Sequence, residues 1–471
     1  MPVSLRKPQR EIPAAAYDRD AIDRRRACGR SSTSRVSFSP IKSREAASLP
    51  GIALPLSASG VHQITTETRG LKEKNPQITL KSVLDPDSRA GGEMLVHGAY
   101  LHVPFCFHKC HYCDFYSIVD SQDRQAAFVK RLIDEMQAAS PWIRHSLETM
   151  FVGGGTPTLL RTDLWKRLLD AMAEFLPLAG EFTVEANPET VTDELAKVLV
   201  AGGVNRVSIG AQSFDARHLK ALERWHDPAN VRRSVEILRD AGIDNLNLDL
   251  IFAVPGQTVD DWRRDLDAAL ALEPTHISCY GLMYEHNTPL TKRMQAGEIT
   301  PVDQDIEAAM YEAVIEQLAA AGFEHYEISN WARRASGDTR CRHNLLYWRN
   351  RNWWAFGPSA SGHLDGLRWK NIARLGEYLE CESPLPPIMD VERVDQPTRA
   401  GEQFMLGLRL VEGLLSAEVQ ALLARSGPRA AARQAAIEGH LRSGLLEMRD
   451  DRLRLTRRGL LLANDVLVDL V

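Results

Sequence analysis

The strongest chemical feature of the sequence is a group of three cysteines, Cys106, Cys110 and Cys113, in the segment CFHKCHYC. Thiolates select zinc or iron–sulfur clusters. A structural zinc site closes with four ligands, often as two separated pairs. Three thiolates in one tight loop favour instead a [4Fe–4S] cluster with one iron left open. His108 and His111 lie in the same loop, so a zinc site stays open as the alternative.

Polar residues also stand in or at the end of apolar segments further along the chain. Glu185 lies in VEANPE, Gln212 in IGAQSF and Asp249 in LDLIFAVPGQT. A carboxylate in an otherwise apolar strand costs free energy unless it has a partner. We therefore expect these side chains to point at a ligand, the alternative being that each is a structural hydrogen bonder at a strand end.

The elements that must position these residues begin at residue 97. Six apolar runs rich in Val, Ile, Leu and Phe alternate with amphipathic stretches of helical period, which predicts βα units and a parallel sheet. Polar motif residues at the strand ends favour a full or partial (β/α) barrel over an open sheet. The predicted strands are 97–103, 148–154, 181–187, 204–211, 245–254 and 275–282, with an edge strand at 325–331 after a helix at 303–321.

We expect four segments along the chain. Residues 1–93 are rich in Ser, Pro, Arg and Ala without periodicity, which indicates a disordered or mis-annotated extension. Residues 94–335 form the barrel, and 336–395 are an aromatic-rich connector and a Pro-rich linker. Residues 396–471 show three helical patterns and a hairpin around Asp450-Asp451, which is typical of a winged-helix-like domain.

Composition excludes several classes of protein. Residues 1–100 carry 16 basic and 10 acidic residues of the chain's 57 and 62, which leaves 41 basic and 52 acidic residues elsewhere. An acidic main body argues against a protein that grips nucleic acid, although the winged-helix-like tail keeps a DNA-binding regulator as a minor alternative. No apolar run approaches the ~18–20 residues of a membrane span. The odd cysteine count indicates a reducing compartment, the cytoplasm by default.

The spacing CxxxCxxC resembles that of the radical S-adenosylmethionine (SAM) superfamily. In that superfamily the open iron binds the amino and carboxylate groups of SAM, and an electron from the cluster cleaves the sulfonium. The segment GGGTP at 153–157, after the second predicted strand, fits this resemblance. Glycines without Cβ atoms let the backbone approach the methionine moiety closely.

A closer resemblance covers about 375 residues from 97 onward. The motifs YLHVPFCxxxCxYCDF, FVGGGTPT, VEANPE, IGAQSF and DLIFAVPGQT resemble the oxygen-independent coproporphyrinogen III oxidase group, which includes the HemW haem chaperones. The oxidases carry a fourth cysteine where this chain has Phe115. His343-Asn344-Leu-Leu-Tyr347-Trp348 matches the HNxxYW motif of the chaperones, and FMLGLRLVEG resembles their C-terminal domain.

The resemblance implies roles for individual residues. Tyr100, Gly154 and Glu185 match contacts to the cluster-bound SAM. The oxidases bind a second SAM, whose contacts match Gly155, Thr156, Gln212, Arg224 and Asp249. For Arg224 a surface helix arginine is the alternative.

His343 is the candidate haem ligand, because neutral imidazole suits iron. If its segment is helical, His343 and Tyr347 share a face. The alternative is a buried, hydrogen-bonded histidine, with Tyr347, Trp348, Trp353, Trp354 and Phe356 packing the tail against the barrel. Cys341 is a further possible ligand of haem iron.

The resemblance thus implies a partial (β/α)6-type radical-SAM barrel with a C-terminal winged-helix-like domain. It implies a haem chaperone with a [4Fe–4S] cluster and SAM that delivers haem, as cargo, to recipient haemoproteins. A homodimer is compatible with it, and cleavage of SAM would require an electron donor. The alternative function is that of a radical-SAM coproporphyrinogen III dehydrogenase, which decarboxylates propionates in haem biosynthesis.

Overall fold

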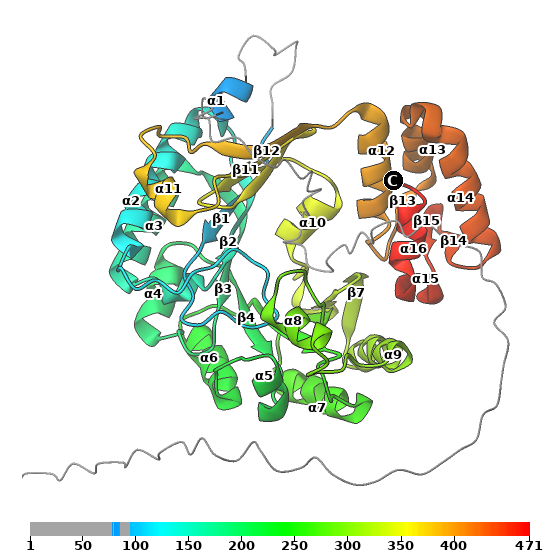
Figure 1. Ribbon diagram of the computed structural model, residues 1–471, viewed down its shortest axis with the longest axis horizontal. Coiled ribbons are helices and arrows are strands. Elements are labelled where there is room, and N and C mark those ends of the chain that lie inside the picture. Colours follow the sequence, from blue (N-terminus) through cyan, green and yellow to red (C-terminus); the bar gives the residue numbers. More distant parts are fainter. Residues whose placement is uncertain (1–77, 79, 85–94) are drawn as a thin grey trace, which may run out of the picture. The chain divides into compact units, whose positions relative to one another are not determined.

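The computed structural model describes residues 78, 80–84 and 95–471. Within them one sheet of 12 strands runs in the order β12-β11-β10-β9-β1-β2-β3-β4-β5-β6-β8-β7 (Figure 1). The strands β1 to β6 are parallel, and β9 pairs with β1 in the same direction. The end strands β12 and β7 do not pair, so the sheet does not close. The α/β partial-barrel prediction is confirmed.

The six predicted parallel strands are all present. They are β1 (Gly98–Val103), β2 (Leu147–Gly154), β3 (Leu178–Ala186), β4 (Arg206–Gln212), β5 (Leu246–Phe252) and β6 (His276–Gly281). Each lies within three residues of its predicted start and end. The apolar runs therefore located the sheet correctly.

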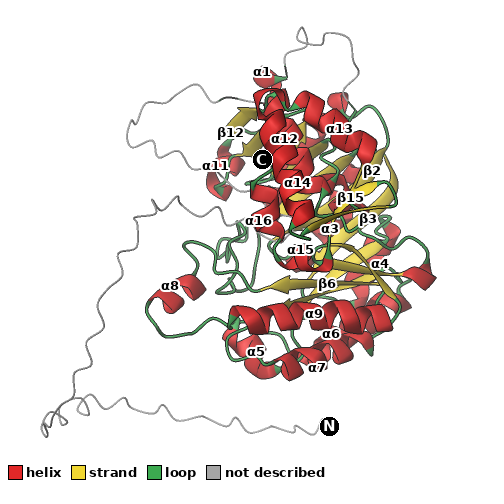
Figure 2. Ribbon diagram, turned by 90° about the vertical axis from the view of Figure 1, so that its right-hand side faces the viewer, coloured by secondary structure: helices red, strands yellow, loops and turns green. Residues whose placement is uncertain are grey.

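The helices between these strands begin at residues that can cap them. Thr192, Asp227 and Thr258 each accept a backbone N–H of the first turn, as N-cap residues do. The helices are α2 (Gln125–Ala139), α3 (Thr162–Phe175), α4 (Asp193–Ala201), α5 (Ala216–Ala221), α6 (Pro228–Asp240), α7 (Val259–Leu270), α8 (Pro289–Gln295) and α9 (Gln304–Ala320). Figures 1 and 2 show α7 and α9 side by side, in line with their contacts.

The prediction of a single edge strand at 325–331 is wrong in one respect, because this segment forms a hairpin of two strands. These are β7 (Phe323–Glu327) and β8 (Asn330–Arg333), of which β8 pairs with β6. The Glu327 carboxylate accepts the backbone N–H of Ser329 at 3.0 Å and closes the turn. No glycine or Asn-Gly pair marks this turn, so the sequence did not show it.

The segment expected as connector and linker contributes regular structure. It holds α10 (Arg342–Trp348), β9 (Trp353–Phe356), β10 (Ser361–Leu364), β11 (Leu367–Asn371), α11 (Leu375–Glu380) and β12 (Ile388–Arg393). The four strands extend the sheet beyond β1. The short strand β9 pairs with β1, more than 250 residues earlier in the chain, and local propensity does not reveal such a pairing.

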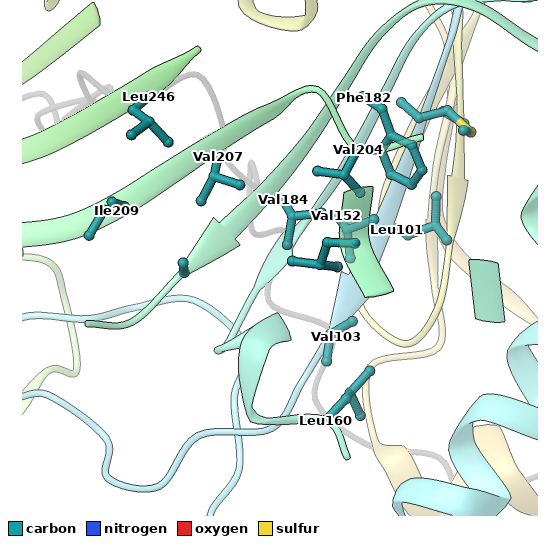
Figure 3. Packing of buried hydrophobic residues seen from close by; sticks show 14 of the residues in the cluster. Leu101, Val103, Val152, Leu160, Phe182, Val184, Val204, Val207, Ile209 and Leu246 are labelled. Atoms are coloured by element: carbon teal, nitrogen blue, oxygen red, sulfur yellow. The ribbon is translucent and has the colours of Figure 1, made fainter. Parts of the chain in front are cut away.

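Residues on alternate positions of the parallel strands face opposite sides of the sheet. One set meets the helices and forms the main hydrophobic core, as the labelled side chains of Figure 3 show. That set includes Leu101, Val103, Val152, Phe182, Val184, Val207, Ile209 and Leu246. The other set faces the inner side of the sheet, where the candidate site lies.

The C-terminal domain has its own core, built around Phe404 and Val466. It contains α12 (Gln396–Gly407), β13 (Leu414–Leu415), α13 (Ser416–Arg425), α14 (Ala430–Arg442), β14 (Leu446–Arg449), β15 (Arg452–Leu455), α15 (Arg457–Leu461) and α16 (Ala463–Val468). The strands β14 and β15 form the hairpin predicted around Asp450-Asp451. The expected three helices with a hairpin are present.

Most of the predicted extension 1–93 lies outside the described residues. The exception is α1 (Leu80–Val83), whose Leu80 is buried in the main core. The carbonyl of Ile78 accepts the N–H of Ile388 in β12 at 2.9 Å. These few residues therefore pack against the fold, while the prediction of a disordered or mis-annotated extension stays a prediction for the rest of the segment. No helix of the described part is long and apolar enough to cross a bilayer.

Candidate functional site

A cavity of ≈ 480 Å³ lies on the inner face of the sheet, a size typical of cofactor sites. The inward-facing residues of the parallel strands that line it are Tyr100, His102, Phe151, Glu185, Arg206, Ser208, Gly210, Asn247, Asp249, Ile251, Ser278 and Tyr280. Most of them are polar, whereas their neighbours in sequence form the apolar core. The alternation of strand residues thus produces both the core and the cavity.

All eight residues that the resemblance assigned to SAM line this one cavity. They are Tyr100, Gly154, Gly155, Thr156, Glu185, Gln212, Arg224 and Asp249. Cys113 and His343 line it too, so the cysteine loop and the candidate haem ligand open onto the same space. Cys106 and Cys110 do not line it, but each contacts a residue that does, Thr156 and Arg224 respectively.

The cysteine loop leaves the end of β1 and returns to it. The N–H of Cys106 donates to the Ile118 carbonyl at 2.9 Å, and the N–H of Ile118 donates to the Pro104 carbonyl at 2.7 Å. These two bonds close the loop at its base. Burial raises the pKa of the Cys106 thiol, and it raises that of Cys113 to about 12. Buried thiols with raised pKa values need a metal or a cation to ionise.

Two polar side chains from other elements reach the sulfurs. Thr156 Oγ1 lies 3.7 Å from Cys106 Sγ, and Arg224 Nη1 lies 3.6 Å from Cys110 Sγ. Arg224 is anchored by donating to the Gly210 carbonyl at 3.0 Å. It follows α5, is half-buried and lines the cavity, so it is not the surface helix arginine of the alternative. Its charge favours ionised sulfur ligands beside it.

The potential ligand atoms of the cysteine loop are not close enough together to form a zinc site. Four ligands around a zinc ion with bonds of about 2.0–2.3 Å lie within about 4 Å of one another. Among the described residues the only group of three potential ligand atoms within 4.8 Å is Asp215, His218 and Asp261, away from the loop. His108 and His111 are therefore not arranged around the cysteine sulfurs as zinc ligands. A wider group such as an iron–sulfur cluster suits the donor set better.

The glycine run packs the end of β2 against the start of the cysteine loop. A Cβ at Gly155 would lie 2.7 Å from the Phe105 carbonyl oxygen, and one at Gly154 would lie 2.5 Å from Cε1 of His102. Gly154 also has a φ of 109°, which L side chains rarely adopt. Its N–H donates to Glu185 at 3.0 Å. Glycine is thus required here for close packing as well as for any ligand contact.

Tyr100 is oriented by a buried histidine. Its hydroxyl lies 3.0 Å from Nδ1 of His102, whose Nε2 lies 2.8 Å from the carbonyl oxygen of Tyr116. Because a carbonyl only accepts, Nε2 carries the proton and Nδ1 accepts from Tyr100. Burial lowers the pKa of His102 to about 4, so the ring stays neutral at pH 7. This arrangement aims the Tyr100 ring into the cavity.

The two carboxylates of the cavity differ in their partners. Asp249 accepts from Ser208 and Asn247, each at 2.8 Å, although burial still raises its pKa. Burial and repulsion from Asp249 raise the pKa of Glu185 to about 7. Glu185 is thus poised to hold or release a proton near neutral pH and can adapt to a charged ligand.

Gln212 lies where the register of β4 against β5 shifts. Its φ of 62° is left-handed, and the pairing skips a residue between Gly210 and Gln212. Such a bulge re-aims a side chain at the end of a strand. Gln212 consequently reaches the cavity together with the other residues that the resemblance assigned to SAM.

The helix α10 holds His343 at the other end of the cavity. The Glu181 carboxylate accepts the N–H groups of Arg342 at 3.0 Å and His343 at 3.1 Å, and so caps this helix. Nδ1 of His343 lies 2.8 Å from Thr149 Oγ1, and Nε2 lies 2.8 Å from the Tyr347 hydroxyl. The helical segment and the shared face predicted for His343 and Tyr347 are confirmed. Burial lowers the pKa of His343 to about 3, so it is neutral.

The aromatic residues of this region divide into two groups. Tyr347 and Trp353 line the cavity, with ring centroids 4.6 Å apart and nearly perpendicular planes. Trp348 packs with Leu345 and Leu410 near the C-terminal domain. Trp354 and Phe356 belong to the main core. Packing of the tail against the barrel therefore fits Trp348, whereas Trp354 and Phe356 pack within the main core. Tyr347 and Trp353 are available to a ligand.

Of the remaining cysteines that the structure describes, Cys341 is the one that lines the cavity. Its Sγ lies 3.6 Å from Glu181, and burial raises its pKa to about 12. Cys279 is buried within β6, as expected of an ordinary core thiol. Cys381 lies 3.6 Å from the Ser383 carbonyl.

Several polar residues of the cavity escaped prediction. They are His102, Arg206, Ser208, Asn247, Ser278 and Lys370. The prediction considered polar residues near the ends of strands, whereas most of these lie at the start or in the middle of one. The signal that would have found them is a polar residue at every second position of a strand whose other positions are apolar.

Comparison with known proteins supports a specific family. Residues 100–269 match the Radical SAM superfamily, and residues 394–462 match the HemN C-terminal domain. The fold resembles that of coproporphyrinogen III oxidase (HemN) from Escherichia coli, a radical SAM enzyme, with a TM-score of 0.70. That similarity covers 80% of this chain and 90% of HemN at 19% sequence identity, and it establishes the fold alone.

Curated relatives match most of the chain. The haem chaperone HemW of Mycobacterium tuberculosis is 38% identical over 378 residues, which is 78% of this chain and 93% of that protein. HemW of Lactococcus lactis is 38% identical over 321 residues, which is 68% of this chain and 83% of that protein. The chain therefore belongs to the haem chaperone HemW family.

Proposed function

We propose that this protein binds haem and passes it to recipient haemoproteins, and that it holds a [4Fe–4S] cluster and SAM. One observation carries the proposal: a single cavity joins the cysteine loop to His343 and Tyr347 of α10 and Trp353 of β9. The cysteines of the described residues are free thiols. This suits the reducing cytoplasm that we propose as the location.

The cluster would bind to Cys106, Cys110 and Cys113. When bound, it would supply an open iron for the amino and carboxylate groups of SAM. Arg224 would stabilise the anionic sulfur of Cys110, from which it lies 3.6 Å. The hydrogen bond of Thr156 to Cys106 favours the thiolate in the same way.

The eight cavity residues assigned by resemblance would surround SAM. Tyr100, held by His102, would offer its ring, and Glu185 would offer a carboxylate near its titration point. The backbone of Gly154 carries no Cβ that would keep a ligand away. Gly155, Thr156, Gln212, Arg224 and Asp249 line the same cavity and, by the resemblance, would contact a second SAM, as in the oxidases.

His343 would bind the haem iron through Nε2. If the N–H of His343 is on Nδ1 and donates to Thr149 Oγ1, the free lone pair of the imidazole is on Nε2. This lone pair then accepts a hydrogen bond from the Tyr347 hydroxyl. Haem would then displace a single hydroxyl to reach a neutral imidazole. Tyr347 and Trp353 would provide a flat aromatic wall beside the porphyrin.

A haemin titration tests the proposal. The anaerobically reconstituted protein with SAM should develop a Soret band that saturates with added haemin. His343→Gln should weaken this binding and shift the band, because it removes the imidazole. His325→Gln is the control, because His325 is stacked on Trp331, with ring centroids 4.3 Å apart, and does not line the cavity.

The possible results of this titration distinguish the haem proposal from its alternatives. Binding that His343→Gln leaves unchanged would move the haem site away from α10. No binding by the wild-type protein would refute the haem proposal, and decarboxylation of coproporphyrinogen III by the same preparation would establish the alternative. Transfer of haem from the loaded protein to an apo-haemoprotein, followed by the spectrum of the recipient, tests delivery.

A further inference from the structure

Arg206 is a buried cation that lacks a partner. It begins β4, is 2% exposed and lines the cavity. Its Nε is buried without a hydrogen-bond partner. Across the part of the chain that the structure describes, its guanidinium makes neither a hydrogen bond nor an ion pair with another residue.

The other buried arginines of the described residues differ from it. Arg131 donates to the carbonyls of Tyr378, Ser383 and Pro384 at 2.7–3.2 Å. Arg433 donates to the Pro397 carbonyl and to Ser426. Arg409 donates to Asn464 at 3.3 Å. Arg409 and Arg433 also keep nitrogens without a hydrogen-bond partner, but each donates at least one hydrogen bond to the protein, whereas Arg206 donates none.

The nearest acidic groups already serve other donors. Glu181 and Asp249 act on Arg206 through space. The oxygens of Glu181 accept the N–H groups of α10, and those of Asp249 accept Ser208 and Asn247. A buried guanidinium costs several kcal/mol unless its donors are satisfied. The remaining direction from which an acceptor can reach Arg206 is the cavity.

We propose that Arg206 binds a carboxylate of the ligand in this cavity, and that this carboxylate is a haem propionate. The inference rests on the haem-binding function proposed above. Guanidinium matches a carboxylate in shape and charge and can hold it through two parallel hydrogen bonds.

The position of Arg206 favours haem over SAM as the source of the carboxylate. Arg206 and Gln212 are the first and last residues of β4, which places them roughly 20 Å apart at about 3.3 Å per residue. Gln212 belongs to the SAM residues near the cysteine loop. Arg206 acts electrostatically on Cys341 and His343, at the end of the cavity that α10 closes, as well as on Glu185 and Asp249. The test below therefore includes the binding of SAM.

The test compares haemin with its dimethyl ester, which has the same iron and ring but no free carboxylate. The full chain is reconstituted with cluster and SAM, and both ligands are titrated in the same detergent. We expect the wild-type protein to bind haemin roughly 10- to 100-fold more tightly than the ester, the size of a charge-assisted hydrogen bond. Arg206→Gln should remove this preference, because it should weaken the binding of haemin and leave the binding of the ester unchanged. Arg206→Lys should restore part of it.

A stability measurement separates this role from a structural one. The apo form of Arg206→Gln should melt close to the wild-type temperature, because the substitution removes no hydrogen bond within the protein and removes both the desolvation cost of the guanidinium and its attraction to Glu181 and Asp249. Arg409→Gln is the matched control: it removes a similarly buried arginine that donates to Asn464 at 3.3 Å and does not line the cavity, so it should keep the preference for haemin.

Four results would overturn the inference. Equal binding of haemin and ester by the wild-type protein would show that no propionate is held. Equal weakening of both ligands by Arg206→Gln would show a general effect on the cavity. Weakened binding of SAM with unchanged binding of haemin would assign the carboxylate to SAM. Absence of any haem binding by the wild-type protein would refute the proposed function itself, and this inference with it.

Discussion

The carboxylate of Glu181 in β3 accepts the backbone N–H of His343 at 3.1 Å, so a strand of the sheet caps the helix that carries the candidate haem ligand. The preceding residue of that helix, Arg342, donates to the same carboxylate at 3.0 Å. A negative charge at a helix N-terminus satisfies free N–H groups and opposes the helix dipole favourably. The position of His343 therefore depends on the sheet as well as on its own helix.

Glu181→Ala should destabilise the protein by about 1–3 kcal/mol, because it leaves buried N–H groups of α10 without an acceptor. It should also weaken haemin binding, since His343 loses its anchor. Chemical denaturation and the haemin titration measure the two effects. Thr192→Ala removes the cap of α4, where Thr192 accepts the N–H of Leu195 at 3.2 Å, and should cost stability without changing haemin affinity.

Gly154→Ala should cost more stability than Gly242→Ala. Both glycines have similar left-handed φ values, 109° and 103°, so the backbone strain of about 1–2 kcal/mol is comparable. A Cβ at Gly154 would also meet the His102 ring at 2.5 Å, whereas nothing lies within 4 Å of one at Gly242. Thermal melting of the two variants measures the difference. Equal losses would show that His102 yields freely to the added methyl group.

The sequence predicted the parallel strands well because each is a long apolar run, and it predicted the cysteine loop from spacing alone. It did not reveal inward-facing residues such as Arg206 and Asn247, because these polar residues alternate with apolar ones inside the strands. It also missed β9, because Trp353 and its neighbours find their partner strand only in the folded chain. The contacts that satisfy both nitrogens of His343, from β2 and from α10, are likewise set by tertiary structure.

The stability of the protein should fall between about pH 4.5 and pH 7 through Glu185. Its pKa in the folded protein is raised to about 7 from 4.5. The folded state thus binds this proton more tightly than the unfolded state, and its contribution, present below pH 4.5, is lost as the pH rises through 7. The loss is roughly 3 kcal/mol at 1.36 kcal/mol per unit. Glu185→Gln should flatten the profile and raise stability at pH 8 in urea denaturation; parallel profiles would contradict the assignment.

Substitutions in the cysteine loop can show which of its residues bind the metal. Cys113→Ala should abolish the visible absorption and most of the iron of the anaerobically reconstituted protein, because Cys113 lies beside the cavity and shares the loop with the two other cysteines. The double substitution of His108 and His111 by alanine should leave both unchanged, because no close set of ligands joins these histidines to the sulfurs. Cys279→Ser is the control for a buried thiol outside the loop. Loss of metal from the histidine variant, with zinc rather than iron in the wild-type protein, would establish a zinc site instead.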